Sequence, residues 1–353
     1  MEGVPRDPAA SRGVTPSLDL DRAQILAFRR RVGALDERLP PGPDSLRTAA
    51  WAGLPDSMPR AALVSIHARV EGTEPSAWED PSLVQVWGPR FSMYVVAKRD
   101  IAPFTLGRLD ETGPSRRKAQ DIAARMATVL DGRRLPDREV AGALGIGNAI
   151  RYAAPTGTIL VRWEGARTPT IWSVPAPDVD PSEARLELAR RFLHVLGPST
   201  PDAFAHWAGI GTPSGRAAFA ALASELMPVR TPIGDAWILS SDEPSFRADP
   251  AGPAPARLLP SGDTYYLLWG SDRELLVPDA GRQSELWTSR VWPGALLVGG
   301  EVVGAWRRAD AKVTIQSWRR LTPAECQSVE AEATSLPLPR VQGRIVVRWA
   351  GSN

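Results

Sequence analysis

The sequence predicts an α+β fold of three tandem winged-helix units, each a helix-turn-helix with a β-wing, followed by a C-terminal β-rich, barrel-like domain. Two observations carry this prediction. Residues 178–255 give a long helix, a short helix, a tight turn, a third helix and an extended segment, which is the winged-helix order. Beyond residue 256, short apolar runs alternate with turn residues, as in small β-domains. The predicted segments are a disordered 1–16, units at 17–110, 111–177 and 178–255, and a β-domain at 256–353.

The first unit is expected to contain three helices and one extended segment. Apolar residues at helical spacing place the helices at 19–32, 45–51 and 59–70. The extended segment is expected at 90–96.

The second unit repeats this order. Ala119, Ile122, Met126 and Leu130 recur at intervals of three and four, which predicts an amphipathic helix over 115–130. The elements expected after it are short helices at 136–144 and 147–154 and a β-hairpin of 158–163 with 170–174. We interpret the hairpin as the wing.

The third unit has the clearest signals. A capping side chain, a first-turn proline and a glutamate occur together at 180–183, and Gly197-Pro198 ends the helix that they begin. Thr200 is expected to cap a short second helix with Phe204 and Trp207 facing inward. A third helix reaching Leu226 and a strand at 236–239 complete the unit.

The C-terminal domain is expected to consist of short strands and one helix. The apolar runs lie at 264–269, 275–277, 294–298, 302–306 and 313–318, with a last strand at 344–349. A single closing helix is expected over 323–333.

Composition excludes several classes of protein. The 353 residues are 43% hydrophobic and 23% charged, as in ordinary globular chains. No uncharged apolar run is long enough for a membrane span, and no apolar signal segment is visible near the start. One cysteine and three scattered histidines argue against a disulfide or a metal site. We expect a cytoplasmic protein, nucleoid-associated if bound to DNA, with no metal, no cofactor and no membrane partner.

The distribution of charge permits a polyanionic partner. Arginine supplies 39 of the 42 basic residues, and its planar fork suits phosphate groups. Residues 111–177 and 281–353 each carry a net charge of +4, whereas residues 178–280 carry −6. Two basic zones therefore flank an acidic one.

Four stretches resemble a known family. They are AAWAGLPDSMPRAALVSIHARV at 49–70, RRFLHVLGPSTPDAFAHWAGI at 190–210, LLPSGDTYYLLWGSDRELL at 258–276 and VGGEVVGAWRR at 298–308. The chain resembles, over about residues 19–335, the winged-helix DNA-binding proteins that include the AlkZ and YcaQ type DNA glycosylases. The resemblance implies a cradle around double-stranded DNA and removal of bulky or cross-linking alkyl adducts from purines, without metal or cofactor.

The catalytic motif of that family is incomplete here. The family has Gln-x-Gln or Gln-x-Asp at the turn before the third helix of the first unit, and this position falls on Pro55-Asp56-Ser57. With a register shifted by one, Asp56 matches the aspartate and Leu54 stands where a glutamine belongs. Asp56 and Ser57 are therefore the candidate catalytic residues: a carboxylate there stabilises an oxocarbenium ion or accepts a proton from water. The alternative is that Asp56 or Ser57 caps the following helix.

The candidate DNA-binding residues are basic or polar groups at helix starts and hairpin tips. They are Arg60, Arg90, Arg116, Arg117, Lys118, Arg167, Thr212, Ser214 and Arg216. Helix capping for Thr212 and Ser214, and solvated charge for the 116–118 cluster, are the alternatives. His67 lies at helical spacing with Leu63 and Val70 and is expected to be a partly buried structural histidine.

Three functions remain open at this point. The first is a glycosylase acting on alkylated purines in duplex DNA, with Asp56 at its centre. The second is a non-catalytic DNA-binding protein that shields lesions or regulates transcription, which the missing glutamines favour. The third is a protein scaffold, which the acidic segment 178–280 favours.

Overall fold

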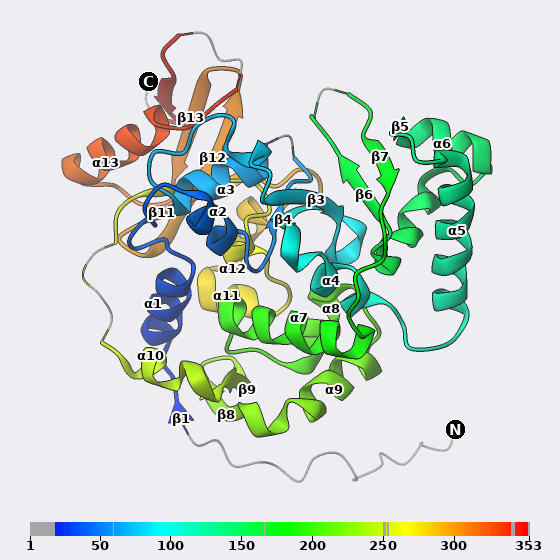
Figure 1. The fold of residues 1–353 in the computed structure, drawn as a ribbon. Coiled ribbons are helices and arrows are strands. Elements are labelled where there is room, and N and C mark those ends of the chain that lie inside the picture. Colours follow the sequence, from blue (N-terminus) through cyan, green and yellow to red (C-terminus); the bar gives the residue numbers. More distant parts are fainter. Residues whose placement is uncertain are drawn as a thin grey trace, which may run out of the picture.

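A computed structural model describes residues 18–58, 60–165, 167–249, 252, 254–339 and 343–351. The described chain is a mixed α+β structure with three sheets, which confirms the predicted class (Figure 1). The segment 1–16, expected to be disordered, lies outside the described residues.

The first part of the chain contains the three expected helices, the expected extended segment as β4, and three strands that were not expected, β1, β2 and β3. Its elements are β1 (Leu18–Asp19), α1 (Arg22–Val32), α2 (Pro43–Ala49), β2 (Leu54–Pro55), α3 (Ala61–Arg69), η1 (Ala77–Glu79), β3 (Leu83–Trp87), η2 (Pro89–Phe91), β4 (Met93–Ala97), η3 (Lys98–Asp100), α4 (Ile101–Phe104) and η4 (Leu106–Arg108). Strand β3 has almost no exposed face, so its sequence lacks the alternation that marks a half-buried strand.

The middle of the chain follows the predicted order closely. Its elements are α5 (Pro114–Leu130), β5 (Leu135–Pro136), α6 (Asp137–Leu144), η5 (Gly147–Thr156), β6 (Ile159–Arg162), β7 (Thr170–Ser173), α7 (Pro181–Leu196), α8 (Pro201–Ala208), α9 (Thr212–Ala221), η6 (Ala223–Glu225), β8 (Leu226–Thr231), β9 (Gly234–Leu239), η7 (Ser240–Asp242) and α10 (Glu243–Arg247). The Asp180 side chain accepts the backbone N–H groups of Ser182 and Glu183, which confirms the predicted start of α7. The prediction for Leu226 was wrong, because it begins strand β8.

The C-terminal part is built around a five-stranded sheet. Its elements are β10 (Arg257–Leu259), η8 (Thr264–Tyr266), α11 (Asp272–Leu276), α12 (Ala280–Leu286), β11 (Gly294–Val298), β12 (Glu301–Ala309), β13 (Lys312–Ser317), α13 (Pro323–Thr334) and β14 (Val346–Trp349). The expected strands at 264–269 and 275–277 are absent: Asp263 caps a 3-10 turn at the first, and α11 covers most of the second. Among the described residues β10 and β14 each pair with one neighbouring strand and form the two edges of the sheet. The sheet is therefore open and does not close into the expected barrel.

The hairpins of the first and second predicted units form a single sheet. Its order is β2-β4-β3-β6-β7-β5, and Gln85 of β3 pairs with Val161 of β6. The predicted boundary between the first two units, at residue 110, therefore divides the sequence but does not divide this sheet. The shared sheet joins the turn before α3 to the hairpin that we interpreted as the wing of the second unit.

The N-terminal segment packs against elements that lie far from it in sequence. Strand β1 pairs in parallel with β8, and α1 packs against α10 (Figure 1). Ile25 and Phe28 of α1 are fully buried in a cluster with residues of β8, β9 and α10. The apolar face of the first predicted helix thus packs against residues that were predicted to belong to the third unit.

Candidate functional site

Asp56 follows strand β2 and is buried beneath the start of α3. Its backbone N–H donates to the Met93 carbonyl at 2.8 Å, which fixes it beside β4. Its Oδ1 accepts the backbone N–H of Ala62 at 3.1 Å and so satisfies a first-turn N–H group of α3, although the N-cap residue of this helix is Arg60. The whole residue is only 1% exposed, whereas Ser57 is exposed.

Gln85 is the partner of Asp56 that the sequence reasoning missed. Its Nε2 donates to Asp56 Oδ2 at 2.7 Å and to the Trp163 carbonyl at 3.3 Å. Its Oε1 accepts the Trp163 backbone N–H at 2.7 Å. A polar side chain inside the apolar run Leu83–Trp87 was the available signal, because a buried amide needs partners.

Burial changes the acidity of this carboxyl group. Burial raises the pKa of Asp56 to about 6, against the opposing effects of the bonds from Ala62 and Gln85 and of the charges on Arg60 and Arg162. A carboxyl group with such a pKa is mostly ionised at neutral pH and can exchange a proton there. The chemistry available is that of a base or of a stabiliser of positive charge.

Arg60 ties this centre to the turn that follows β6. It adopts a left-handed backbone conformation and donates to the Trp163 carbonyl at 3.2 Å and the Glu164 carbonyl at 3.0 Å. The guanidinium carbons of Arg60 and Arg162 each lie 3.6 Å from the ring centre of the buried Trp78. The Arg60 side chain that we predicted to bind DNA therefore also has a structural role, because it holds the turn after β6.

A second feature is a cleft of about 540 Å³ between α5, η5 and the start of α9, which we name the α5–α9 cleft. Its lining residues are Phe91, Arg108, Leu109, Asp110, Ser115, Lys118, Ala119, Tyr152, Pro155, Gly209, Ile210 and Gly211. The Lys118 ammonium lies 4.3 Å from the ring centre of Tyr152, whose side chain is exposed. Arg108 is buried, which lowers its pKa to about 10.

Two helix N-termini open toward this cleft. The N-caps of α5 and α9 are Gly113 and Gly211, and in the described chain no side chain caps either helix. Neither first turn contains an acidic residue. Free backbone N–H groups at positive helix ends are suited to phosphate oxygens. For Thr212 the capping alternative fails, because Gly211 occupies the N-cap position.

The other candidate DNA-binding residues are dispersed. Arg117 and Arg167 are exposed, and Arg116 donates to the carbonyl groups of Asp110 and Glu111. Arg216 forms an exposed ion pair with Asp202. Ser214 lies in the first turn of α9 and is half-buried.

Arg90 does not extend from the molecule as a wing tip. Its Nη1 lies 3.0 Å from His206 Nε2 of α8, and its guanidinium lies 5.4 Å from the Trp269 ring centre. The β3–β4 turn that carries Arg90 therefore docks on the third unit. This contact occupies one edge of the guanidinium that we predicted for DNA.

Neither a metal-binding cluster nor a membrane-spanning helix is present among the described residues. No group of three or more histidine, cysteine, aspartate or glutamate side chains in the described ranges is arranged to hold a metal ion. Among the described helices none has the length and apolar character needed to cross a bilayer.

The comparisons with known proteins agree with the resemblance. A family model, DNA glycosylase AlkZ-like, matches residues 51–337. The fold is similar to that of the Streptomyces sahachiroi DNA glycosylase AlkZ, with a TM-score of 0.78, 19% sequence identity, and coverage of 94% of this chain and 100% of that one. No curated protein sequence matches the chain. Because the family model spans well over half of the sequence, the chain belongs to the AlkZ-like DNA glycosylase family.

Proposed function

We propose that this protein is a DNA glycosylase that releases N-alkylated purines from duplex DNA, with Asp56 as its central residue. Family membership supports glycosylase chemistry in general. The observation that carries the assignment to Asp56 is its buried pairing with Gln85, which joins a carboxyl and an amide group, the two kinds of group in the family's Gln-x-Asp motif. Gln85 thus supplies from β3, two strands away in the sheet, the amide that Leu54 and Pro55 do not.

The reaction asks little of the protein. An N7-alkylated purine already carries positive charge, so its glycosidic bond is weakened before the enzyme acts. As the bond breaks, the sugar becomes an oxocarbenium ion, which a nearby carboxylate stabilises. Asp56 supplies that charge or takes a proton from the attacking water, and Gln85 holds one of its oxygens in place. Ser57, exposed beside it, is a second polar group for that water.

Access to Asp56 requires one local movement. Asp56 is buried, and its partner Gln85 and the nearby Arg60 both bond to the backbone of the turn Trp163–Glu164. Arg167, which is exposed, follows in the same hairpin turn. We infer that contact between this turn and a DNA strand draws Trp163 away and opens the carboxylate.

The α5–α9 cleft is the proposed contact for the phosphate backbone. Lys118 and two uncapped helix N-termini provide donors and positive charge there. Phe91 of the cleft is two residues from Met93, whose carbonyl accepts the Asp56 backbone N–H, so at most about 7 Å of chain and one hydrogen bond connect the two features. Three winged-helix units arranged around one duplex remain part of this proposal.

One observation favours DNA binding without base excision as the second candidate. Both Asp56 oxygens are already hydrogen-bonded within the protein, and neither family glutamine is present in the motif. In that case the protein shields a lesion or regulates transcription.

A base-release assay on duplex DNA containing N7-methylguanine separates the two. We expect released base from the wild-type protein and none from Asp56→Asn, which keeps an oxygen for the Ala62 N–H but cannot ionise. Asp121→Asn, on the exposed face of α5, is the matched control and should retain activity. Tight binding without any product from the wild type would instead establish the second candidate, and equal release by Asp56→Asn would remove Asp56 from the reaction.

A further inference from the structure

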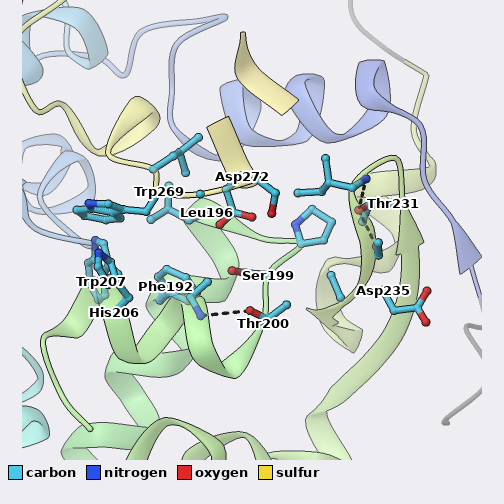
Figure 2. A pocket seen from close by; sticks show the side chains of 18 of the residues that line it. Phe192, Leu196, Ser199, Thr200, His206, Trp207, Thr231, Asp235, Trp269 and Asp272 are labelled. Atoms are coloured by element: carbon cyan, nitrogen blue, oxygen red, sulfur yellow. Dashed lines mark hydrogen bonds between the residues drawn. The ribbon is translucent and has the colours of Figure 1, made fainter. Parts of the chain in front are cut away.

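A cavity of about 460 Å³ lies between the third unit and the loop that precedes α11, apart from Asp56 and from the α5–α9 cleft. Its walls are the end of α7, α8, the β8–β9 turn and residues 267–272. Figure 2 shows Trp269, His206 and Trp207 gathered at one end, and Thr231 and Asp235 at the other. Phe192 and Leu196 of α7 contribute apolar surface.

Three polar groups of this cavity have no hydrogen-bond partner in the described part of the chain. Ser199 and Trp207 are 2% and 1% exposed, and the Ser199 hydroxyl and the Trp207 Nε1–H are both unpaired. The third group is the half-buried carboxylate of Asp272, which lies across the cavity from Ser199 (Figure 2). The Ser199 and Trp207 atoms are shielded from the open volume, so the Asp272 carboxylate is the unpaired group that a ligand in the cavity can reach.

The charged side chains that line the cavity are acidic, and the basic side chains near it lie outside its lining. Asp272 and Asp235 line it, and no lysine or arginine does so among the described residues. Asp235 is already paired with Arg230 on the outside. His206 is neutral at physiological pH, because burial, Arg90 and Arg273 lower its pKa.

Arg29 does not satisfy Asp272. Its guanidinium is buried behind the cavity wall and donates to the carbonyl groups of Leu196 and Gly197 at 2.5 and 3.0 Å. It acts on Asp272 only through its charge, and burial is the larger influence, raising the pKa of that carboxyl group. The carboxylate therefore faces the cavity without a donor.

We propose that this cavity binds a small organic cation with a flat apolar body. Asp272 receives the ammonium or amidinium group, and the rings of Trp269 and Phe192 cover the flat part. The site does not depend on glycosylase activity, since it shares no residue with the Asp56 centre.

Isothermal titration calorimetry of the full chain at mildly alkaline pH tests the proposal. The probes are tyramine and benzamidinium, and their neutral counterparts of nearly equal shape are tyrosol and benzamide. We expect the cations to bind and each neutral counterpart to bind at least about tenfold more weakly, the loss expected for one charge-assisted hydrogen bond.

Three variants assign the binding to this cavity. Asp272→Asn removes the charge and should weaken cation binding by about tenfold, with no change for the neutral compounds. Ala203→Leu fills the cavity from α8 without lowering helix propensity and should abolish binding of all four compounds. Asp121→Asn, remote on α5, should behave as the wild type.

Some results would overturn the proposal. No measurable binding of either cation by the wild type would do so, as would equal affinity for a cation and its neutral counterpart. Binding that survives both Asp272→Asn and Ala203→Leu would place the compounds elsewhere. Base release is measured separately, so a failure here leaves the proposed function untouched.

Discussion

Asp56 is held in the interior by two hydrogen bonds and carries a raised pKa. Those bonds favour its charged form, yet burial outweighs them, because removing a carboxylate from water disfavours its charge more than two partners restore. The same feature serves both the helix start and the proposed chemistry. The pKa of Asp56 can therefore be tested through protein stability, independently of catalysis.

Asp56→Asn should change how stability depends on pH. The folded-state pKa is about 6 against an ordinary value of 3.8, so between these pH values the folded protein binds more protons than the unfolded chain. Its contribution to stability therefore falls as pH rises through that window, by about 3 kcal/mol. Urea unfolding at about pH 4 and pH 7 should show the variant gaining that amount relative to wild type. Parallel profiles for the two proteins would contradict the assigned pKa.

His67 should remain neutral across the physiological range. Burial, followed by the charges of Arg38 and Arg257, lowers its pKa to about 3, and its Nε2 lies 3.1 Å from Ser335 Oγ. At 6% exposure it is the buried structural histidine expected from the sequence.

The pH dependence of the stability contribution from His67 is opposite in sign to that from Asp56. Below about pH 6.5 the unfolded chain binds the proton first, so this contribution to stability is lost as pH falls toward 3. In an NMR titration the His67 ring signals should not move between about pH 5 and pH 8. A midpoint near its ordinary value would show that the ring is accessible to protons in the folded state.

Among the elements, β3 joins the two halves of the largest sheet. Gln85 on this strand binds both Asp56 and the backbone of Trp163, so the turn before α3 and the hairpin β6–β7 share one side chain. The sequence order alone separates these segments by many residues. Their meeting makes the proposed centre a product of two predicted units.

Gln85→Ala should loosen this junction. It leaves the Trp163 N–H and Asp56 Oδ2 without partners, which lowers the free energy of unfolding by roughly 2–4 kcal/mol. Hydrogen exchange at the Trp163 amide should accelerate, since its acceptor is gone. Gln316→Ala, an exposed glutamine bonded to Glu285, is the control and should change neither quantity appreciably. Unchanged exchange at Trp163 would show that this contact does not hold the hairpin.

Element prediction succeeded where local signals were complete. The cap at Asp180 and the apolar spacing of α7 were sufficient because both act within a few residues. Strand β3 was missed because it is almost wholly buried, and 264–269 was misread because apolar residues there pack around a turn. Both segments are rich in apolar residues because distant parts of the chain bury them, so their composition does not distinguish a strand from a turn.

At the scale of the whole molecule, the proposed DNA contact rests on charge gathered from separate helices. Arg117 and Lys118 are exposed on α5, and Lys118 lies in the cleft that the N-terminus of α9 also lines. Counter-ion release makes such binding depend on salt in proportion to the number of phosphates neutralised.

The double variant Arg117→Ala, Lys118→Ala should weaken duplex binding and reduce the log–log salt slope by about 2, since each phosphate contact contributes roughly 0.9. Arg320→Ala, an exposed arginine after β13, should leave the slope unchanged. Fluorescence anisotropy with a labelled duplex at several salt concentrations measures both. An unaltered slope in the double variant would move the DNA contact away from the α5–α9 cleft.

The sequence by itself determined the α+β class, most of the helices, the family and the candidacy of Asp56, because periodicity, capping residues and motifs act over short stretches of chain. Only the tertiary structure decided that α1 packs on the third unit, that two hairpins share one sheet and that Gln85 lies against Asp56. Each of these depends on which buried surfaces meet. Apolar surfaces attract without direction, so local sequence does not specify their partners.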